Sequence, residues 1–185
     1  MEFVADLHLH SKYSRAVSQS MTLPIIARWA AKKGLDIVSA CDFTHPLWLR
    51  EIKNQLQESS EGLYKLKVKS ETLKVDEVRF LLSTEIASIY KQGEKLRRIH
   101  NLLFAPNFET VEKINVELVK RGANLTADGR PIIGLSSRQL LELVLSIDRK
   151  IMLIPAHIWT PHFGIYGSAS GFDSLEEEFG DYAKH

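Results

Sequence analysis

The chain has 185 residues, of which 44% are hydrophobic and 25% charged, values that fit one globular domain with a sizeable core. Its net charge of +1 lacks the basic excess of many nucleic-acid-binding proteins, although a balanced total can still contain a local basic patch. The single cysteine excludes an intramolecular disulfide, and without a secretory signal or a ~20-residue apolar span we expect a cytoplasmic protein with no membrane partner.

The first part of the chain alternates short apolar runs with amphipathic stretches. Strands are predicted at 3–9, 37–41, 64–68 and 79–83. Helices are predicted at 22–34, where Pro24 lies in the first turn and Gly34 ends the helix, and at 46–56. The buried side of the second helix is expected to contain Leu47, Leu49, Ile52 and Leu56. The polar stretch 58–76 is interpreted as an insertion beside the core.

The second part continues in the same way. A hairpin of strands 86–90 and 96–98 is predicted, followed by strands at 99–105 and 151–155. Helices are predicted at 111–121, 137–147 and 174–182. Strands that alternate with helices predict parallel βαβ units, so we expect one α/β domain over residues 1–185.

The first candidate site is the run Asp6-Leu7-His8-Leu9-His10. Side chains alternate between the two faces of a strand, so Asp6, His8 and His10 are expected to share one face. Two imidazoles on one face can chelate a metal ion, with Asp6 supporting them from behind. Taken alone, this pattern is equally compatible with two histidines that face solvent.

Similar side chains follow other predicted strands. Asp42 and His45 follow the strand 37–41, Glu85 follows 79–83, and His157 follows 151–155. Functional side chains of parallel α/β barrels collect at the carboxyl ends of the strands, so these residues predict a shared metal site. Imidazole and carboxylate without thiolate favour zinc, manganese or iron, and Glu85 is the expected bridging carboxylate of a centre that hydrolyses phosphoesters. The neighbouring Cys41 is expected to pack in the core.

These residues lie in motifs that resemble a known family. DLHLHSKYS is similar to the opening motif of the polymerase and histidinol phosphatase (PHP) superfamily, while CDFTHP and STEI occupy the places of its second and third motifs. Longer peptides resemble endonuclease Q, namely DFTHPLWL, STEIASIYK, RRIHNLLFAPNFETVEKIN, TADGRPIIGLSS and PAHIWTPHFGIYGSASGFDSLEE. The resemblance covers nearly the whole chain.

The resemblance implies a distorted (β/α)7 barrel of the PHP type, incomplete here, with about five of its strands present. It implies a metal-dependent DNA repair endonuclease that cuts on the 5′ side of a deaminated base or abasic site. Zinc in two or three sites is the implied cofactor, with Mn²⁺ or Mg²⁺ as alternatives. The residues assigned to metal binding are His8, His10, Asp42, His45, Glu85, His100 and His157, and those assigned to catalysis are Glu85, Asp42 and His157.

The chain departs from the family pattern in two places. No histidine follows the opening motif within 11–20, and the downstream Asp-x-His motif has no counterpart. We therefore interpret the chain as an N-terminal part that can be inactive by itself. His100, a ligand by resemblance, begins its predicted strand instead of ending it, so support of a neighbouring ligand is the alternative role.

Contacts to damaged DNA are predicted on the loops around these motifs. Lys12, Arg15 and Arg130 are candidates for phosphate binding, and Tyr13, Trp159 and Phe163 are candidates for stacking on an extruded base. Solvated cations and aromatic packing over a barrel rim are the alternatives. His162 and His185 are expected to face solvent.

Two other functions remain open from the sequence. A small-molecule phosphatase can use the same metal ligands, and a non-catalytic module can use metals only to stabilise a surface for DNA or a partner. The sequence has no Gly-x-x-x-x-Gly-Lys-Ser/Thr motif, so nothing in it predicts an ATP site.

Overall fold

The structure, a computed structural model, describes residues 2–67 and 75–184. Eight strands in this part form one mixed sheet. Parallel pairing joins β1 (Ala5–Asp6) to β2 (Ile37–Ser39) and β2 to the first residues of β5 (Arg79–Gln92). The helix α1 (Leu23–Lys33) connects β1 to β2, which gives the crossover that a parallel pair requires.

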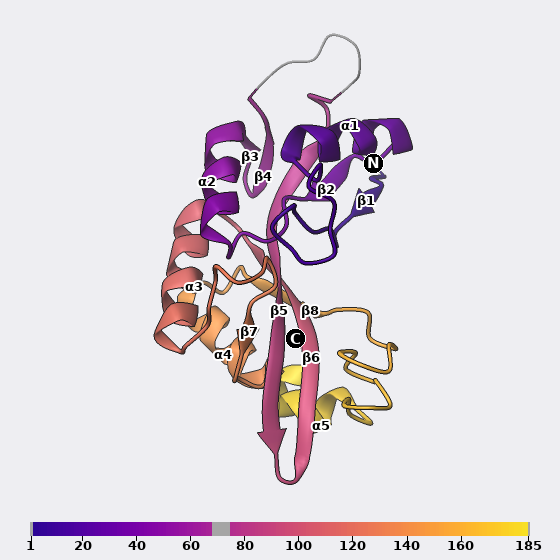
Figure 1. Ribbon diagram of the computed structural model, residues 1–185, viewed down its shortest axis with the longest axis vertical. Coiled ribbons are helices and arrows are strands. Elements are labelled where there is room, and N and C mark those ends of the chain that lie inside the picture. Colours follow the sequence, from indigo (N-terminus) through magenta and orange to yellow (C-terminus); the bar gives the residue numbers. More distant parts are fainter. Residues whose placement is uncertain (1, 68–74, 185) are drawn as a thin grey trace.

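A long hairpin dominates the second half of the sheet. β5 continues to Gln92, turns at Gly93 and Glu94, and returns as β6 (Lys95–Ala105), so that the two strands run the length of the molecule (Figure 1). Gly93 has a φ of 59°, a conformation that glycine adopts without a steric cost and that tight hairpin turns require. The predicted hairpin is therefore correct, but its strands merge with the runs 79–83 and 99–105 that were predicted as separate strands.

The remaining strands join this hairpin. β8 (Met152–Pro155) pairs antiparallel with β6, and β7 (Ile132–Ile133) pairs in parallel with β5. β3 (Leu56–Ser60) and β4 (Leu63–Leu66) form a second hairpin that lies beside the start of β5. The stretch predicted as an insertion thus belongs partly to the sheet, whereas Val68 of the predicted strand 64–68 lies outside the described residues.

The prediction of parallel βαβ units throughout is wrong. Pairing is antiparallel within β3–β4, β4–β5, β5–β6 and β6–β8. In the hairpins β3–β4 and β5–β6 a tight turn leads directly from one strand to the next, which makes the pair antiparallel. A mixed α/β fold is correct, but the strands of residues 2–67 and 75–184 form an open sheet and not a closed barrel.

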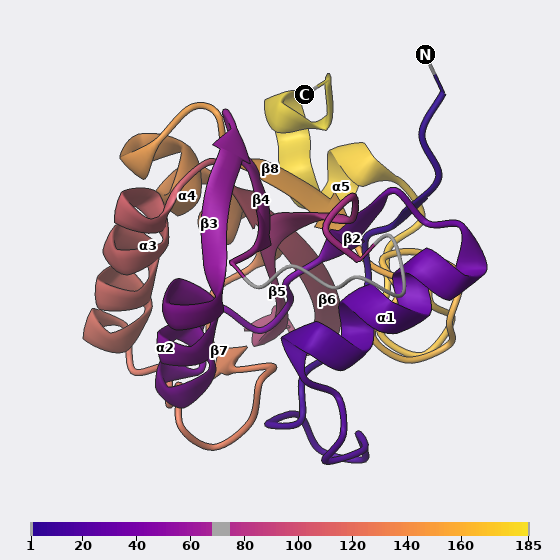
Figure 2. The same ribbon diagram turned by 90° about the horizontal axis from the view of Figure 1, so that it is seen from above.

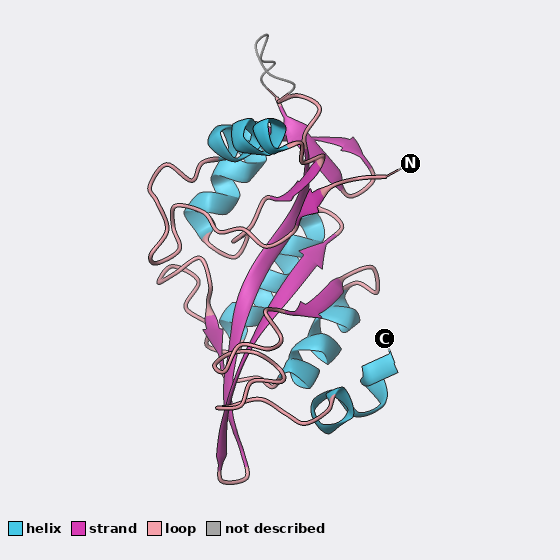
Figure 3. Ribbon diagram, turned by 90° about the vertical axis from the view of Figure 1, so that its right-hand side faces the viewer, coloured by secondary structure: helices cyan, strands magenta, loops and turns pink. Residues whose placement is uncertain are grey.

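Helices cover one face of the sheet. Figure 2 shows α2 (Pro46–Gln55), α3 (Phe108–Lys120) and α4 (Ser137–Ile147) along one flank, with α1 across from them. All four helices contribute to the main hydrophobic core, with side chains such as Leu23, Trp48, Ile114 and Leu140. A short α5 (Leu175–Phe179) and the 3-10 turn η1 (Gly180–Lys184) close a second apolar cluster at the far end of the molecule (Figure 3).

The second helix buries a different side chain from the one predicted. Leu47 is exposed, whereas Trp48 is fully buried. The indole N–H of Trp48 donates to the carbonyl oxygens of Ala40 (2.9 Å) and Cys41 (3.0 Å), so this side chain anchors the turn that follows β2.

Strand alternation decides what faces away from the helices. The even-numbered residues Phe80, Leu82 and Ile86 of β5 lie in the main core, so the odd-numbered Leu81 and Glu85 point to the opposite face. A small apolar cluster of Leu102, Phe104 and Ala156 lies on that face, with Leu7 and Leu81 packed against it. Glu85 is on the same face of β5 as this apolar cluster.

Candidate metal centre

Glu85 lies at the centre of a histidine cluster. Its carboxylate is 2% exposed and faces four imidazoles. The oxygen Oε1 lies 3.3 Å from Nε2 of His8, 3.0 Å from Nδ1 of His100 and 3.2 Å from Nε2 of His157. The other oxygen, Oε2, lies 3.3 Å from Nε2 of His10. Three separate segments of the chain therefore converge on one buried carboxylate.

Strand direction explains how these segments meet. β8 is antiparallel to β6, which is antiparallel to β5, so β8 runs in the same direction as β1, β2 and β5. His8 and His10 follow β1 and His157 follows β8, so all three lie at the same end of the sheet. Glu85 differs from the prediction, because it lies inside β5, which continues past its neighbour β2.

The unusual place of His100 has the same explanation. β6 runs opposite to β5. The residues of β6 that come before its pairing with β8, such as His100, therefore lie at the end of the sheet where the parallel strands finish. In the register of the hairpin, His100 is opposite Ala87 and therefore lies diagonally across from Glu85 on the same face. A histidine in the middle of an antiparallel strand thus joins candidate ligands from the ends of parallel ones.

The cluster contains two groups whose donor atoms fit a metal ion. One group is His8, His10 and Glu85, the other is Glu85, His100 and His157, and within each the donor atoms lie within 4.8 Å of one another. Glu85 belongs to both groups, as a bridging carboxylate of a two-metal centre would. Imidazole with one carboxylate is a donor set of zinc, manganese or iron. These residues are therefore able to hold metal, and several divalent ions fit the same donor set.

The charge balance of the cluster also calls for a cation. Burial raises the pKa of Glu85, but hydrogen bonds from His10, His100, His157 and His8 outweigh it and hold the pKa far below its usual range. Burial lowers the pKa of His10, but its bonds to Asp42 and Glu85 outweigh this and raise the pKa to about 9. In the metal-free chain a proton on His10 balances the buried carboxylates, at the position where a metal would supply positive charge.

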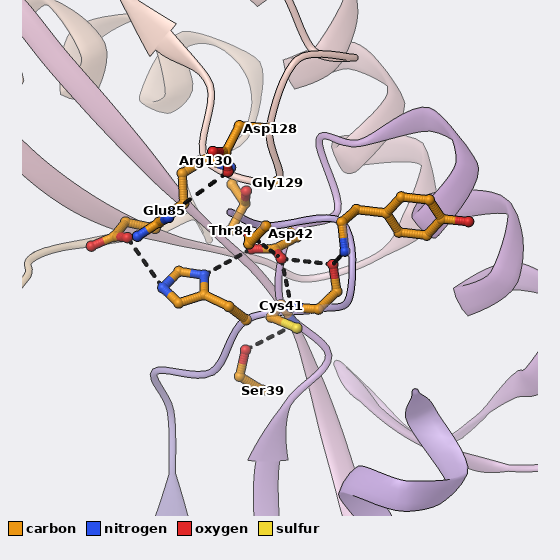
Figure 4. A network of polar contacts seen from close by, with 12 residues as sticks. Ser39, Cys41, Asp42, Thr84, Glu85, Asp128, Gly129 and Arg130 are labelled. Carbon is orange, nitrogen blue, oxygen red and sulfur yellow. Dashed lines mark hydrogen bonds and ion pairs between the residues drawn. The ribbon is translucent and has the colours of Figure 1, made fainter. Parts of the chain in front are cut away.

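Asp42 lies beside the cluster and takes part in neither group. It is fully buried, with Oδ1 3.1 Å from Nδ1 of His10. Its other oxygen accepts hydrogen bonds from the backbone N–H of Ser11 (2.6 Å), the hydroxyl of Ser11 (2.7 Å) and that of Ser14 (2.8 Å). Figure 4 shows the Asp42 side chain close to Gly129 and Thr84. Cys41 is buried, as predicted, and burial raises the pKa of its thiol.

His45 lies apart from the cluster. It occupies the position before the first residue of α2, and its ring stacks on Tyr13 at a centroid distance of 4.3 Å and an angle of 19°. Burial lowers the pKa of His45, which keeps the imidazole neutral near pH 7. The structure places it as a packed histidine of the loop that follows β2.

The predicted phosphate-binding cations already have partners. Lys12 lies 2.9 Å from Glu51, and the guanidinium groups of Arg15 and Arg130 each lie 3.6 Å from a carboxylate oxygen of Asp128. Arg15 is the most exposed of the three, with 79% of its side chain accessible. A phosphate would have to compete with these carboxylates.

The three aromatic candidates have different surroundings. Tyr13 packs on His45 and donates its hydroxyl to Glu51 at 2.9 Å. The ring of Phe163 lies 4.2 Å from that of His100, so this side chain backs a candidate ligand. Trp159 is 75% exposed and stacks on Tyr166 at a centroid distance of 4.9 Å.

Other predicted residues have minor roles in the geometry. Asp6 accepts a hydrogen bond from the backbone N–H of His8 at 3.4 Å and so supports the loop rather than an imidazole. His162 is exposed, as expected, and His185 lies outside the described residues.

Sequence reasoning missed several residues of this region. Thr160 places its hydroxyl 3.0 Å from Nδ1 of His157, and its spacing of three residues from a candidate ligand was an available signal. Ser11, Ser14 and Gly129 surround Asp42. Gly129 comes from a loop remote in sequence, and no local pattern points to its role.

Comparison with known proteins supports the resemblance seen in the motifs. No family model matches the chain. An uncharacterised protein of Methanocaldococcus jannaschii is 30% identical over 156 residues, which cover 84% of this chain and 16% of that protein. An uncharacterised protein of Bacillus subtilis is 28% identical over 188 residues, covering 95% of this chain and 45% of that protein.

Two solved structures match almost the entire chain. The lesion-specific endonuclease PfuEndoQ of Pyrococcus furiosus superimposes with a TM-score of 0.79 and 31% identity. Endonuclease Q in complex with a 27-mer duplex substrate, with an abasic lesion at the active site, superimposes with a TM-score of 0.80 and 32% identity. Each match covers 97% of this chain and 40% of the solved chain. The predicted resemblance to endonuclease Q is thereby confirmed, and this chain spans less than half the length of these relatives.

The helices of residues 2–67 and 75–184 are all too short or too polar to cross a lipid bilayer.

Proposed function

We propose that this chain forms the metal-binding part of a DNA repair endonuclease that hydrolyses a phosphodiester on the 5′ side of a deaminated base or abasic site. The single observation that carries the proposal is the convergence of His8, His10, His100 and His157 on Glu85. The fold around this cluster is similar to that of endonuclease Q, one structure of which contains DNA with an abasic lesion.

The residues of the cluster have distinct roles in this proposal. His8, His10 and Glu85 would hold one metal ion, and Glu85, His100 and His157 would hold a second. Divalent metal ions, when bound, supply Lewis acidity that activates water and stabilises negative charge on the phosphate. Imidazole-rich coordination favours zinc over Mg²⁺, with Mn²⁺ as the alternative.

The accessibility of the cluster favours a polymeric substrate over a small phosphomonoester. His8 and His157 keep 31% and 32% of their side chains accessible on the open face of the sheet. A phosphatase requires a closed pocket that surrounds its substrate. The groove of about 640 Å³ between α4, β8 and α5 is lined by none of the cluster residues.

Base recognition in this proposal involves Trp159. It follows His157 by two residues, and its exposed indole is supported from behind by Tyr166. Aromatic faces stack on bases without demanding a particular sequence, as an enzyme that reads damage in any context requires. Arg15 is the cation best placed for a phosphate, because its guanidinium is largely exposed.

The test combines metal analysis with cleavage. The protein, in the longest form that its gene encodes, is loaded with zinc or manganese and incubated with end-labelled duplexes that carry one abasic site, one uracil or no lesion. The proposal is supported if the protein binds metal and cuts only on the 5′ side of the lesion. Rapid turnover of p-nitrophenyl phosphate without cleavage favours the phosphatase, bound metal with neither activity favours the non-catalytic module, and a metal-free protein contradicts the metal centre.

A further inference from the structure

The contacts of one carboxylate oxygen of Asp42 leave no room for a metal ion. The oxygen Oδ2 accepts three hydrogen bonds, two from Ser11 and one from Ser14, at 2.6–2.8 Å. A carboxylate oxygen that accepts three donors has no free lone pair for a metal. Gly129 covers the same oxygen from another side, since a Cβ at this position would lie 2.5 Å from Oδ2.

The remaining oxygen of Asp42 has one partner. Oδ1 lies 3.1 Å from Nδ1 of His10, and the opposite nitrogen of this ring, Nε2, lies 3.3 Å from Glu85. A buried carboxylate next to one ring nitrogen stabilises a proton on that nitrogen, and the other nitrogen is then free to donate its lone pair.

We propose that Asp42 is a positioning residue, which fixes His10 with Nδ1 protonated and Nε2 directed at the metal, and that Asp42 does not itself bind metal. This inference rests on the metal centre proposed above. The role differs from the metal-binding role that the motif resemblance implies.

The backbone around Asp42 is arranged for this task at a conformational cost. Cys41 and Asp42 have φ values of 45° and 40°, in the left-handed region that is sterically unfavourable for non-glycine residues. Three hydrogen bonds offset that cost. The indole N–H of Trp48 donates to the carbonyls of Ala40 and Cys41, and the hydroxyl of Ser39 accepts from the N–H of Cys41 at 2.9 Å.

In the two candidate metal groups, the Nδ1 atoms of His10 and His157 face chemically different partners. The Nδ1 of His10 faces a carboxylate, whereas the Nδ1 of His157 faces the neutral hydroxyl of Thr160 at 3.0 Å. A carboxylate partner makes the imidazole a stronger donor to metal than a hydroxyl does. The metal held by His8, His10 and Glu85 is therefore expected to bind more tightly than the metal held by His100 and His157.

Asp42→Asn tests the role directly, because an amide keeps the shape of the side chain. The backbone N–H of Ser11 requires an oxygen acceptor, so the amide oxygen takes the place of Oδ2 and the NH₂ group faces Nδ1 of His10. His10 then has to accept at Nδ1 and carries its proton on Nε2, where it blocks metal binding. Ser14→Ala, which removes one donor to Asp42, is the milder second variant, and the exposed Asp76→Asn is the control.

Two measurements separate positioning from ligation. Zinc affinity is measured by competition with a chromophoric chelator, and the Nδ1–H proton of His10 is followed by NMR in the zinc-loaded chain. We expect Asp42→Asn to weaken the affinity for one of two zinc ions by roughly 10–100-fold and to abolish the Nδ1–H signal. Ser14→Ala should lower the affinity for the same ion by a smaller factor.

The outcomes that overturn the proposal differ from those that overturn the metal centre. Unchanged affinity for both ions with the Nδ1–H signal retained in Asp42→Asn excludes positioning by Asp42. Loss of zinc with the Nδ1–H signal unchanged, and no effect of Ser14→Ala, shows instead that Asp42 is a ligand. A wild-type chain that binds no zinc removes the metal centre itself, and this inference with it.

Discussion

The Nδ1 atom of His100 lies 3.0 Å from Oε1 of Glu85, although the two residues lie on strands that run in opposite directions. The hairpin register brings them together, since His100 pairs with Ala87 and so lies diagonally across from Glu85 on one face of the sheet. Four imidazoles share that carboxylate. The central position of Glu85 makes it the residue whose loss should affect both metal positions at once.

Glu85→Gln is therefore expected to abolish binding of both metal ions. An amide keeps the volume of the side chain but removes the charge and one acceptor oxygen that the two groups share. Elemental analysis of the purified variant checks this result. Glu109→Gln, on an exposed side chain of α3, is the control and should keep full metal content. Retention of one tightly bound ion by Glu85→Gln would contradict the bridging role.

Thr160→Val should weaken only the metal held by His100 and His157. The hydroxyl of Thr160 lies 3.0 Å from Nδ1 of His157 and donates to a backbone carbonyl, so valine leaves the imidazole without an orienting partner. We expect roughly 10-fold weaker binding of one ion, measured by chelator competition. Thr22→Val, at a threonine whose side chain makes no capping hydrogen bond, serves as the control. Equal weakening of both ions would argue against separate orienting partners.

Trp48→Phe should reduce both stability and metal retention. The substitution keeps an aromatic ring but leaves the carbonyls of Ala40 and Cys41 without their buried donor. Such a loss costs about 1–3 kcal/mol in the free energy of unfolding, measured by urea denaturation. Trp29→Phe, at a tryptophan that is 54% exposed on α1, should change stability by less than about 0.5 kcal/mol. Similar losses for the two variants would show that the hydrogen bonds of Trp48 are unimportant.

The metal-free chain should lose stability between pH 6.5 and pH 9. The pKa of His10 is raised from 6.5 to about 9 in the folded state, so its contribution is fully present below pH 6.5 and disappears as pH rises through the folded value. The change amounts to about 3 kcal/mol in the free energy of unfolding. Thermal unfolding with a chelator present measures it, and His10→Gln should flatten the pH dependence. If the stability of His10→Gln fell with pH as steeply as that of the wild-type chain, other titrating groups would be responsible for the effect.

Trp159→Ala should weaken binding to lesion-containing DNA without changing metal content or stability. Its indole is 75% exposed, so the folded core loses little when the ring is removed. Stacking on one base contributes about 1–3 kcal/mol, which corresponds to a loss of roughly 5–150-fold in affinity. Fluorescence anisotropy with a uracil-containing duplex checks this value, with Trp29→Ala as the control. Unchanged affinity would remove Trp159 from the DNA surface.

Local sequence patterns predicted the parts of the fold that local physics decides. Pro24 and Gly34 mark the first helix because proline fits its first turn and glycine accepts the left-handed conformation after its end, where the φ of Gly34 is 71°. Alternation along the chain placed His8 and His10 on a common face, and positions after predicted strands supplied Glu85 and His157 as further candidates. The motif resemblance added His100.

Strand direction and partner choice were decided by the tertiary structure. Alternating elements predicted parallel βαβ units, but the sheet is mixed and open, because the turn at Gly93 sends β6 back along β5. Leu47 was expected on the buried side of the second helix but is exposed, and Trp48 is buried instead, where its indole N–H reaches the carbonyls of Ala40 and Cys41.

The sequence by itself determined which residues can bind metal, because imidazole and carboxylate chemistry is a property of the residue. Only the tertiary structure decided which of them meet. Asp42 and His45 carry the same chemistry as Glu85 and His10, yet Asp42 is surrounded by Ser11, Ser14 and Gly129, and His45 packs on Tyr13. Those neighbours come from segments distant in the chain, so their effect on a side chain depends on folding and leaves no local trace.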